Sequence, residues 1–307
     1  MLNASDFIHP EDEAALRELE SIPALSAIVK KIMEIGYENI TYGVNLASSI
    51  RLSPTQLPHI YNRLPPICEQ LGISQPEFYL EMNPVPNAYT SGETRVFICV
   101  TSGLVEMMNE EELDAVLAHE CGHILCHHVM YSMVAQYALS GIDSLGLLGS
   151  LAKPAIYSLL YWNRKSELSA DRCAAVVTSP DVVARVMARL SGGPKSITEN
   201  INMKEWASQA DVYDSFANEN LWNKAQQASR LMDLSHPYSA IRVREILKWA
   251  QSYEYQHLVQ LLRLGRSDLK CPRCHSSVLP EWAFCKFCGE KLRNEENGDS
   301  PEGTTIR

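Results

Sequence analysis

The sequence predicts an α+β fold that is mainly helical, with a small β-sheet directly before a central helix and a small four-cysteine module after the main domain. Three observations lead to this prediction. A helical pattern over residues 109–131 contains the sequence HECGH at 119–123. Short runs of β-forming residues occupy residues 77–102, just ahead of it. Two Cys-x-x-Cys pairs lie within residues 271–288.

The central helix has a well-defined start. Asn109 is a good N-cap and Glu112 stands three residues later, which is the spacing of a capping box. Acidic residues crowd the first turn, where the helix dipole favours them. Leu113, Val116 and Leu117 then recur at helical spacing. We therefore expect HECGH to lie inside a helix.

Two histidines of this helix point to a metal site. His119 and His123 are one turn apart and share a face, so their imidazoles can hold one zinc ion. Glu120 is rotated from them and can take a proton from a water at the same metal. The alternative is an exposed helix with two stray histidines.

A third zinc ligand is expected from a separate helix downstream, because two histidines make an incomplete site. Residues 163–178 look like that helix, and its Glu167 and Asp171 are four residues apart on one face. Taken alone they would be a charged helical surface. Beside two histidines, Glu167 is the best candidate ligand, and Asp171 can accept the free N–H of a zinc-bound histidine.

The sheet before the helix has three predicted strands, at 78–80, 88–90 and 96–100, with Pro84 and its neighbours in a loop. A sheet edge beside a metal site can bind an extended peptide as one more strand. A purely structural sheet is the equal alternative.

Composition excludes some partners. The 307 residues carry a net charge of −10, so nucleic acid is not expected as a partner. Nine cysteines fit a reducing compartment, and the first residues show no basic and apolar leader pattern, so the expected location is cytoplasmic.

Residues 129–162 are apolar but interrupted by charges, glycines and Pro154. No uncharged stretch reaches the roughly 18–20 residues that span a bilayer. We expect a helical hairpin that lines or shields the cleft, with peripheral membrane contact through 129–162 as the alternative.

A lone histidine precedes another predicted helix. Residues 235–238 read Ser-His-Pro-Tyr, and Pro237 suits a first helical turn. His236 would be fixed in direction there and could donate a hydrogen bond to an oxyanion. A structural histidine is the alternative.

The four-cysteine module contains Cys271, Cys274, Cys285 and Cys288. Each Cys-x-x-Cys pair forms a knuckle, and two knuckles complete a tetrahedral site for a structural zinc ion. A pair of redox disulfides is the alternative. Because this zinc ribbon has almost no core, the metal must supply its folding energy. We interpret it as a protein-binding module, and residues 294–307 as a disordered tail.

Four ordered segments resemble the M48 (HtpX-like) zinc metallopeptidases, a gluzincin family. They are NAYTSG at 87–92, VTSGLVEMMNEEELDAVLAHECGHI at 100–124, NRKSELSADRCA at 163–174 and SHPYSAIRVREI at 235–246. The resemblance implies that His119, His123 and Glu167 bind the catalytic zinc and that Glu120 is the general base. It also implies that Asp171 hydrogen-bonds to a zinc-bound histidine and that His236 stabilises the transition state. Clear transmembrane helices, which membrane-embedded members have, are lacking here.

The predicted organisation is an N-terminal helical region at 1–75, a metallopeptidase domain at 76–265, the zinc ribbon at 268–293 and the tail. The predicted function is that of a zinc metalloendopeptidase acting on protein or peptide substrates, with one catalytic and one structural zinc. The alternatives are a non-catalytic protein-binding or chaperone-like protein and a zinc-storage or metal-sensing protein.

Overall fold

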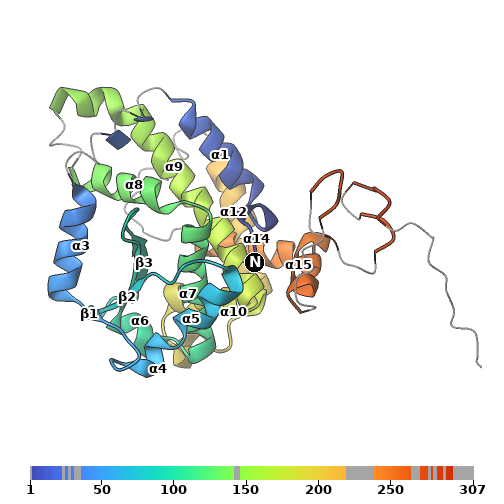
Figure 1. The fold of residues 1–307 in the computed structure, drawn as a ribbon, viewed down its shortest axis with the longest axis horizontal. Helices are drawn as coiled ribbons and strands as arrows, with labels where there is room; N and C mark the ends of the chain where they lie inside the picture. Colours follow the sequence, from blue (N-terminus) through green and yellow to red (C-terminus); the bar gives the residue numbers. More distant parts are fainter. Residues whose placement is uncertain are drawn as a thin grey trace, which may run out of the picture. The chain divides into compact units, whose positions relative to one another are not determined.

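A computed structural model describes most of the chain (Figure 1). The described residues are 2–22, 25–26, 29–30, 36–141, 146–218, 238–263, 270–275, 278, 282–285 and 288–292, without the side chains of 37, 136–141, 146–154, 217–218 and 261–263. The chain divides into two compact units, Met1–Tyr255 and Gln256–Arg307. The finer boundaries expected from the sequence stay predictions, and the expected tail at 294–307 lies outside the described residues.

The structure confirms the expected fold class, since helices dominate and the described strands form one small mixed sheet. In chain order the elements are η1 (Ala4–Asp6), α1 (Pro10–Glu20), α3 (Tyr37–Ser48), β1 (Ile50–Arg51), α4 (Pro58–Tyr61), α5 (Leu64–Leu71), β2 (Glu77–Glu81), β3 (Ala88–Ser91), β4 (Phe97–Thr101), α6 (Ser102–Met107), α7 (Glu110–Leu125), α8 (Val129–Gly141), α9 (Gly146–Val177), α10 (Pro180–Gly192), α11 (Lys195–Thr198), α12 (Met203–Asn218), α14 (Ser239–Ala250) and α15 (Tyr253–Arg263).

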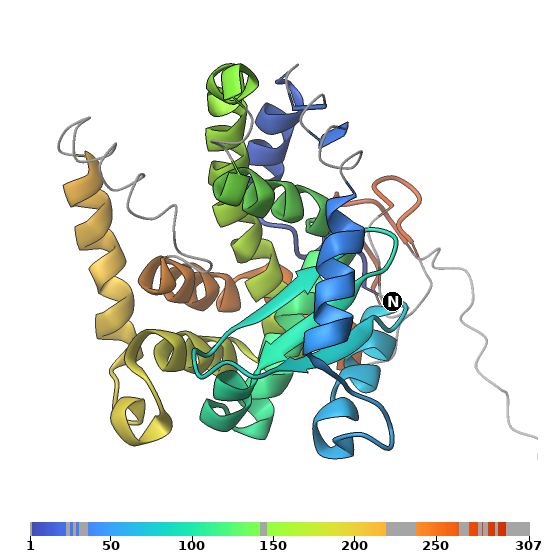
Figure 2. The ribbon, with the colours of Figure 1, turned by 90° about the vertical axis from the view of Figure 1, so that its left-hand side faces the viewer.

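The sheet has the order β1-β2-β4-β3, with β2 and β4 parallel and both outer strands antiparallel to their neighbours. All of β4 is buried, because both faces of the sheet are covered. Figure 2 shows α3 in front of the sheet and α7 behind it. On the α3 side, Tyr42 packs against Phe97 with ring centroids 6.3 Å apart. The three predicted strands correspond to β2, β3 and β4, whereas the two-residue β1 was not predicted.

The central helix α7 begins as predicted. Asn109 and Glu112 form the capping box, and both of its hydrogen bonds are present. Glu112 is also buried against Arg189 of α10, with 3.1 Å between the charged groups. The helix ends at Leu125 and not near residue 131, because the chain turns at His127, where φ is 58°.

The expected helical hairpin at 129–162 is formed by α8 and α9. The helix expected separately at 163–178 is continuous with the hairpin, since α9 runs without interruption from 146 to 177. Its buried residues Ile156, Leu159 and Trp162 pack into an apolar cluster, and this packing outweighs weak local propensity. Among the described residues, no helix combines the length and apolarity that crossing a membrane requires.

Helix α1 lies along α9, with Ala15 and Leu19 in the cluster that contains Trp162 (Figure 1). Helix α14 packs on α9 and α10 and begins at Ser239, directly after Tyr238. The predicted helix start around Pro237 lies outside the described residues. Helices α1, α7, α9 and α14 together surround the predicted metal site.

Candidate metal centre

The three predicted zinc ligands converge on one point. His119 and His123 come from α7, and Glu167 comes from α9. The two Nε2 atoms are 3.2 Å apart. One carboxylate oxygen of Glu167 is 3.5 Å from His119 Nε2, and the other is 3.4 Å from His123 Nε2. The structure therefore brings together a donor set that could hold a metal ion.

These spacings fit zinc. Zinc–nitrogen and zinc–oxygen bonds of about 2.0–2.1 Å give a tetrahedral site edges of roughly 3.3–3.4 Å, close to the three separations above. All three side chains are buried. The unprotonated nitrogens of two neutral imidazoles and a carboxylate are all acceptors, so they need a proton or a cation between them. The chemistry of the three donors therefore also fits a zinc ion.

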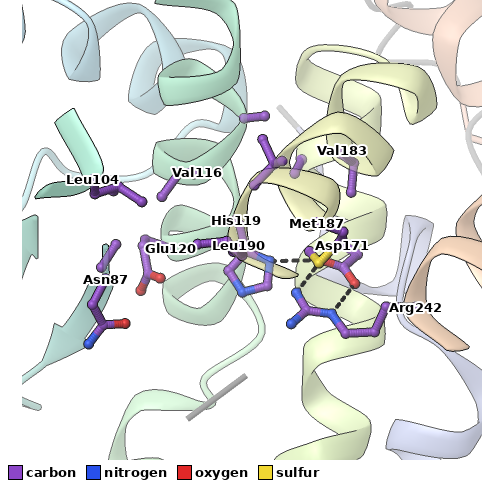
Figure 3. Close-up of a pocket in the computed structure, with 14 residues that line it drawn as sticks. Asn87, Leu104, Val116, His119, Glu120, Asp171, Val183, Met187, Leu190 and Arg242 are labelled. Carbon is purple, nitrogen blue, oxygen red and sulfur yellow. Dashed lines mark hydrogen bonds and ion pairs between the residues drawn. The ribbon is translucent and has the colours of Figure 1, made fainter. Parts of the chain in front are cut away.

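His119 is held from behind by a carboxylate. Its Nδ1 is 3.0 Å from Asp171 Oδ1, and Asp171 accepts two hydrogen bonds from Arg242 of α14 at 2.6 and 2.7 Å (Figure 3). Burial alone would raise the pKa of Asp171, but the guanidinium of Arg242 lowers it. Burial alone would likewise lower the pKa of His119, but hydrogen bonds to Asp171 and Glu167 raise it to about 10. A centre that attracts a proton this strongly also suits a divalent cation.

Arg242 bridges the two carboxylates of the centre. Its third nitrogen, Nη1, lies 2.8 Å from Glu167 Oε2, and its side chain is 3% exposed. Arg242 was not predicted as a site residue. The pattern that could have identified it is an arginine within the otherwise apolar stripe of Val243, Ile246 and Trp249 on α14.

The predicted general base Glu120 points to the same site from α7. Thr90 of β3 donates a hydrogen bond from Oγ1 to Glu120 Oε2 at 2.6 Å. This contact fixes one carboxylate oxygen and leaves the other for a proton. Thr90 was not predicted either, because a contact between residues thirty positions apart leaves no local pattern.

An apolar pocket opens beside Glu120 and His119 (Figure 3). Its volume is about 440 Å³ including the open mouth. Its apolar walls come from α6, α7 and α10, namely Leu104, Val116, Val183, Val186, Met187 and Leu190. Such a pocket can take an apolar side chain next to the reacting bond. The predicted oxyanion donor His236 lies outside the described residues.

The four predicted ribbon cysteines also meet, within the unit that begins at Gln256. Cys271 Sγ lies 3.6 Å from Cys288 Sγ, and Cys274 Sγ lies 3.6 Å from Cys285 Sγ. A disulfide needs about 2.05 Å. Zinc–sulfur bonds of about 2.3 Å give a tetrahedral edge near 3.8 Å. The spacing therefore favours a shared metal over the disulfide alternative.

Comparisons with known proteins identify the family of this chain. The family model described as Peptidase family M48 matches residues 55–250. The chain belongs to peptidase family M48. The predicted family is thus confirmed, and with it the coarse function of a metallopeptidase that uses zinc and acts on proteins or peptides.

Relatives cover different shares of this M48 chain. A protein from Arabidopsis thaliana named plastoglobule-localized metallopeptidase 48, chloroplastic, is 36% identical over 264 residues, which is 84% of this chain and 76% of the relative. A protease HtpX homologue from Tropheryma whipplei strain TW08/27 is 24% identical over 52% of this chain. The chain spans about half the length of that homologue, with 55% covered. No solved structure matches this chain.

The expected cytoplasmic location is contradicted, because the Arabidopsis relative is named for the plastoglobule and the chloroplast. The expectation was based on nine cysteines and the composition of the first residues. Cysteine usage indicates only that a compartment is reducing, and it does not distinguish one reducing compartment from another.

Proposed function

We propose that this M48 peptidase is a zinc-dependent endopeptidase in which His119, His123 and Glu167 hold the catalytic zinc and Glu120 is the general base. The convergence of the three donors at separations of 3.2 to 3.5 Å carries the proposal. Bound zinc would polarise a peptide carbonyl and lower the pKa of a water to about 7.

Glu120 takes the proton from the attacking water and passes it to the leaving amine. The hydrogen bond from Thr90 orients its carboxylate during both transfers. Asp171 holds His119 in the tautomer that leaves Nε2 free for the metal. His236 remains our candidate for a hydrogen bond to the developing oxyanion.

The substrate is proposed to lie along β3, which is an outer strand of the sheet and packs against α7. An extended peptide that pairs with this strand would pass Glu120, the partner of Thr90. The neighbouring apolar pocket would then receive an apolar substrate side chain. The four cysteines hold a second, structural zinc, and the ribbon around it is proposed to bind a protein partner.

The first test compares zinc-loaded wild type with Glu120→Gln on an unstructured protein substrate. We expect Glu120→Gln to keep its zinc and to lose roughly 10²–10⁴-fold in turnover, because it lacks a proton acceptor. Mass spectrometry of the products gives both the rate and the cleavage sites, which we expect to be enriched in apolar residues.

Glu106→Gln is the matched control, since Glu106 is an exposed carboxylate on α6. It should cleave like wild type. Undiminished turnover by Glu120→Gln would exclude the proposed base. A zinc-loaded wild type that cleaves nothing would favour the non-catalytic, protein-binding alternative.

A further inference from the structure

The second proposed histidine ligand, His123, hydrogen-bonds to a different group of residues from His119. Its Nδ1 lies 3.1 Å from Nδ1 of His128. Nε2 of His128 in turn lies 3.1 Å from Oδ2 of Asp12 on α1. Ser169 of α9 donates a hydrogen bond to the same oxygen of Asp12 at 2.5 Å. His128, Asp12 and Ser169 are each no more than 1% exposed.

The end of α7 explains how His128 reaches His123. The helix terminates in a Schellman motif, in which His128 N–H donates to the carbonyl of His123 and His127 N–H donates to that of Ile124. His127 occupies the left-handed position of the motif. This turn folds the chain back and places the residue after His127 against the third-last residue of the helix. Here both are histidines.

The hydrogen bonds have one consistent direction. If His123 binds a metal through Nε2, its Nδ1 carries the hydrogen and donates to His128 Nδ1. His128 then carries its hydrogen on Nε2 and donates to Asp12. Ser169 donates to Asp12 and accepts from the backbone N–H of His9 at 2.9 Å. Every donor in this series of hydrogen bonds, from His123 to the backbone of His9, therefore has an acceptor.

The charge state of Asp12 agrees with that direction. Burial alone would raise the pKa of Asp12, but hydrogen bonds from His128 and Ser169 bring it below its ordinary value. A fully buried carboxylate is costly, and Asp12 sits in the same helical stripe as the core residues Ala15 and Leu19.

We propose that Asp12, His128 and Ser169 are positioning residues that fix the tautomer and direction of His123, and that α1 is thereby part of the metal centre. This inference rests on the proposed role of His123 as a zinc ligand. Asp12 lies outside residues 55–250, the part that the family model matches.

The test measures metal binding in the full chain as well as activity. The metal is removed from the three-ligand centre with a chelator, and one equivalent of Co²⁺ or Zn²⁺ is returned. Binding at the histidines gives cobalt d–d bands without the thiolate charge-transfer bands that the four cysteines would add. We expect His128→Ala to weaken zinc binding about 10–100-fold and to change the d–d spectrum.

Asp12→Asn keeps the shape of the side chain and should weaken zinc binding about tenfold. The double variant should be no weaker than His128→Ala alone, because Asp12 acts through His128. Two controls separate positioning from folding. His127→Gly removes the neighbouring exposed histidine at a position that suits glycine. Leu19→Ala loosens the packing of α1, should lower the melting temperature, and should leave zinc affinity and the cobalt spectrum unchanged.

The outcomes are distinguishable. Wild type that binds no metal outside the four cysteines would refute the proposed zinc site itself. Wild-type binding with unchanged affinity and spectrum in His128→Ala and Asp12→Asn would overturn the positioning role alone. An effect of Leu19→Ala on zinc affinity equal to that of Asp12→Asn would also overturn it, because general loosening of α1 would then suffice.

Discussion

The two candidate metal centres differ in what lies behind their ligands. In the three-ligand centre each ligand contacts a further polar side chain: His119 contacts Asp171, His123 contacts His128 and Glu167 contacts Arg242. Among the described residues of the four-cysteine centre, the backbone hydrogen bonds around the ligands are short-range, as in the hydrogen bond from Gly289 N–H to the carbonyl of Cys285. Its described core comprises little beyond Cys271, Val278, Trp282 and Cys285.

This difference indicates two relations between metal and fold. Ligands that are fixed by buried helices and charged partners form a site before the metal arrives, as a catalytic centre requires. Ligands on two knuckles with a minimal core depend on the metal for their arrangement. Zinc can therefore serve catalysis in one unit and folding in the other.

Removing one ligand from each centre gives the largest expected effect. Cys285→Ser should unfold the knuckles, because a structural zinc supplies about 10–16 kcal/mol of apparent binding free energy in small zinc modules. Glu167→Gln should leave α7 and α9 folded although zinc is lost. Hydrogen exchange followed by mass spectrometry would show fast exchange at 270–292 only in Cys285→Ser.

Cys68→Ser is the control for the loss of a thiol, since Cys68 is buried in the other unit and is not a proposed ligand. It should leave exchange at 270–292 as in wild type. Protection at 270–292 that survives Cys285→Ser would show that the knuckles fold without their metal, and the contrast between the two centres would disappear.

Arg242→Met should give the next largest effect. It leaves Asp171 and Glu167 buried without their cation, and breaking a buried ion pair in this way costs about 3–5 kcal/mol. Bound zinc would replace part of the lost positive charge, so the metal-free protein should lose more stability than the zinc-loaded one. Urea unfolding of both forms gives the two free energies of unfolding.

Arg244→Met is the matched control on the same helix. Arg244 pairs with Asp211 and Asp214, whose side chains are 70% and 46% exposed, and such pairs contribute about 1 kcal/mol or less. If Arg242→Met and Arg244→Met lowered the free energy of unfolding equally, the ion pairs of Arg242 would contribute no more than ordinary exposed ion pairs. The preformed character of the three-ligand centre would then need another source.

The sequence was informative wherever the chemistry follows from spacing along one element. His119, Glu120 and His123 lie within one helix turn, and the capping box made that helix predictable, as the structure confirms. The four cysteines are equally local. Glu167 and Asp171 required the further argument that a two-histidine site is incomplete, and their roles stay predictions although the structure places them at the centre.

The residues that sequence analysis missed act across the fold. Arg242 and Thr90 contact the centre from elements far away in sequence, and Asp12 reaches it through His128. No spacing along a single element therefore predicts these contacts. Asp12 and Arg242 do leave a trace, since each is a charged residue in an apolar helical stripe. The helix expected separately at 163–178 is part of the longer α9 for a related reason: tertiary packing of α9 decides its continuity, and local propensity is a weak guide.

The smallest predicted effect concerns the orientation of Glu120. Thr90→Val is close to isosteric and removes only the hydroxyl that donates to Glu120 Oε2. We expect kcat to fall about tenfold, the size of one hydrogen bond to a charged group, with KM and zinc content unchanged. Steady-state kinetics on a defined peptide would measure both constants, and Thr90→Ser, which keeps the hydroxyl, should restore kcat.

A loss confined to KM would instead assign Thr90 to substrate binding along β3. A loss of kcat alone would show that the three-ligand centre depends on oriented groups beyond its metal ligands, a requirement that a closed four-cysteine centre does not have.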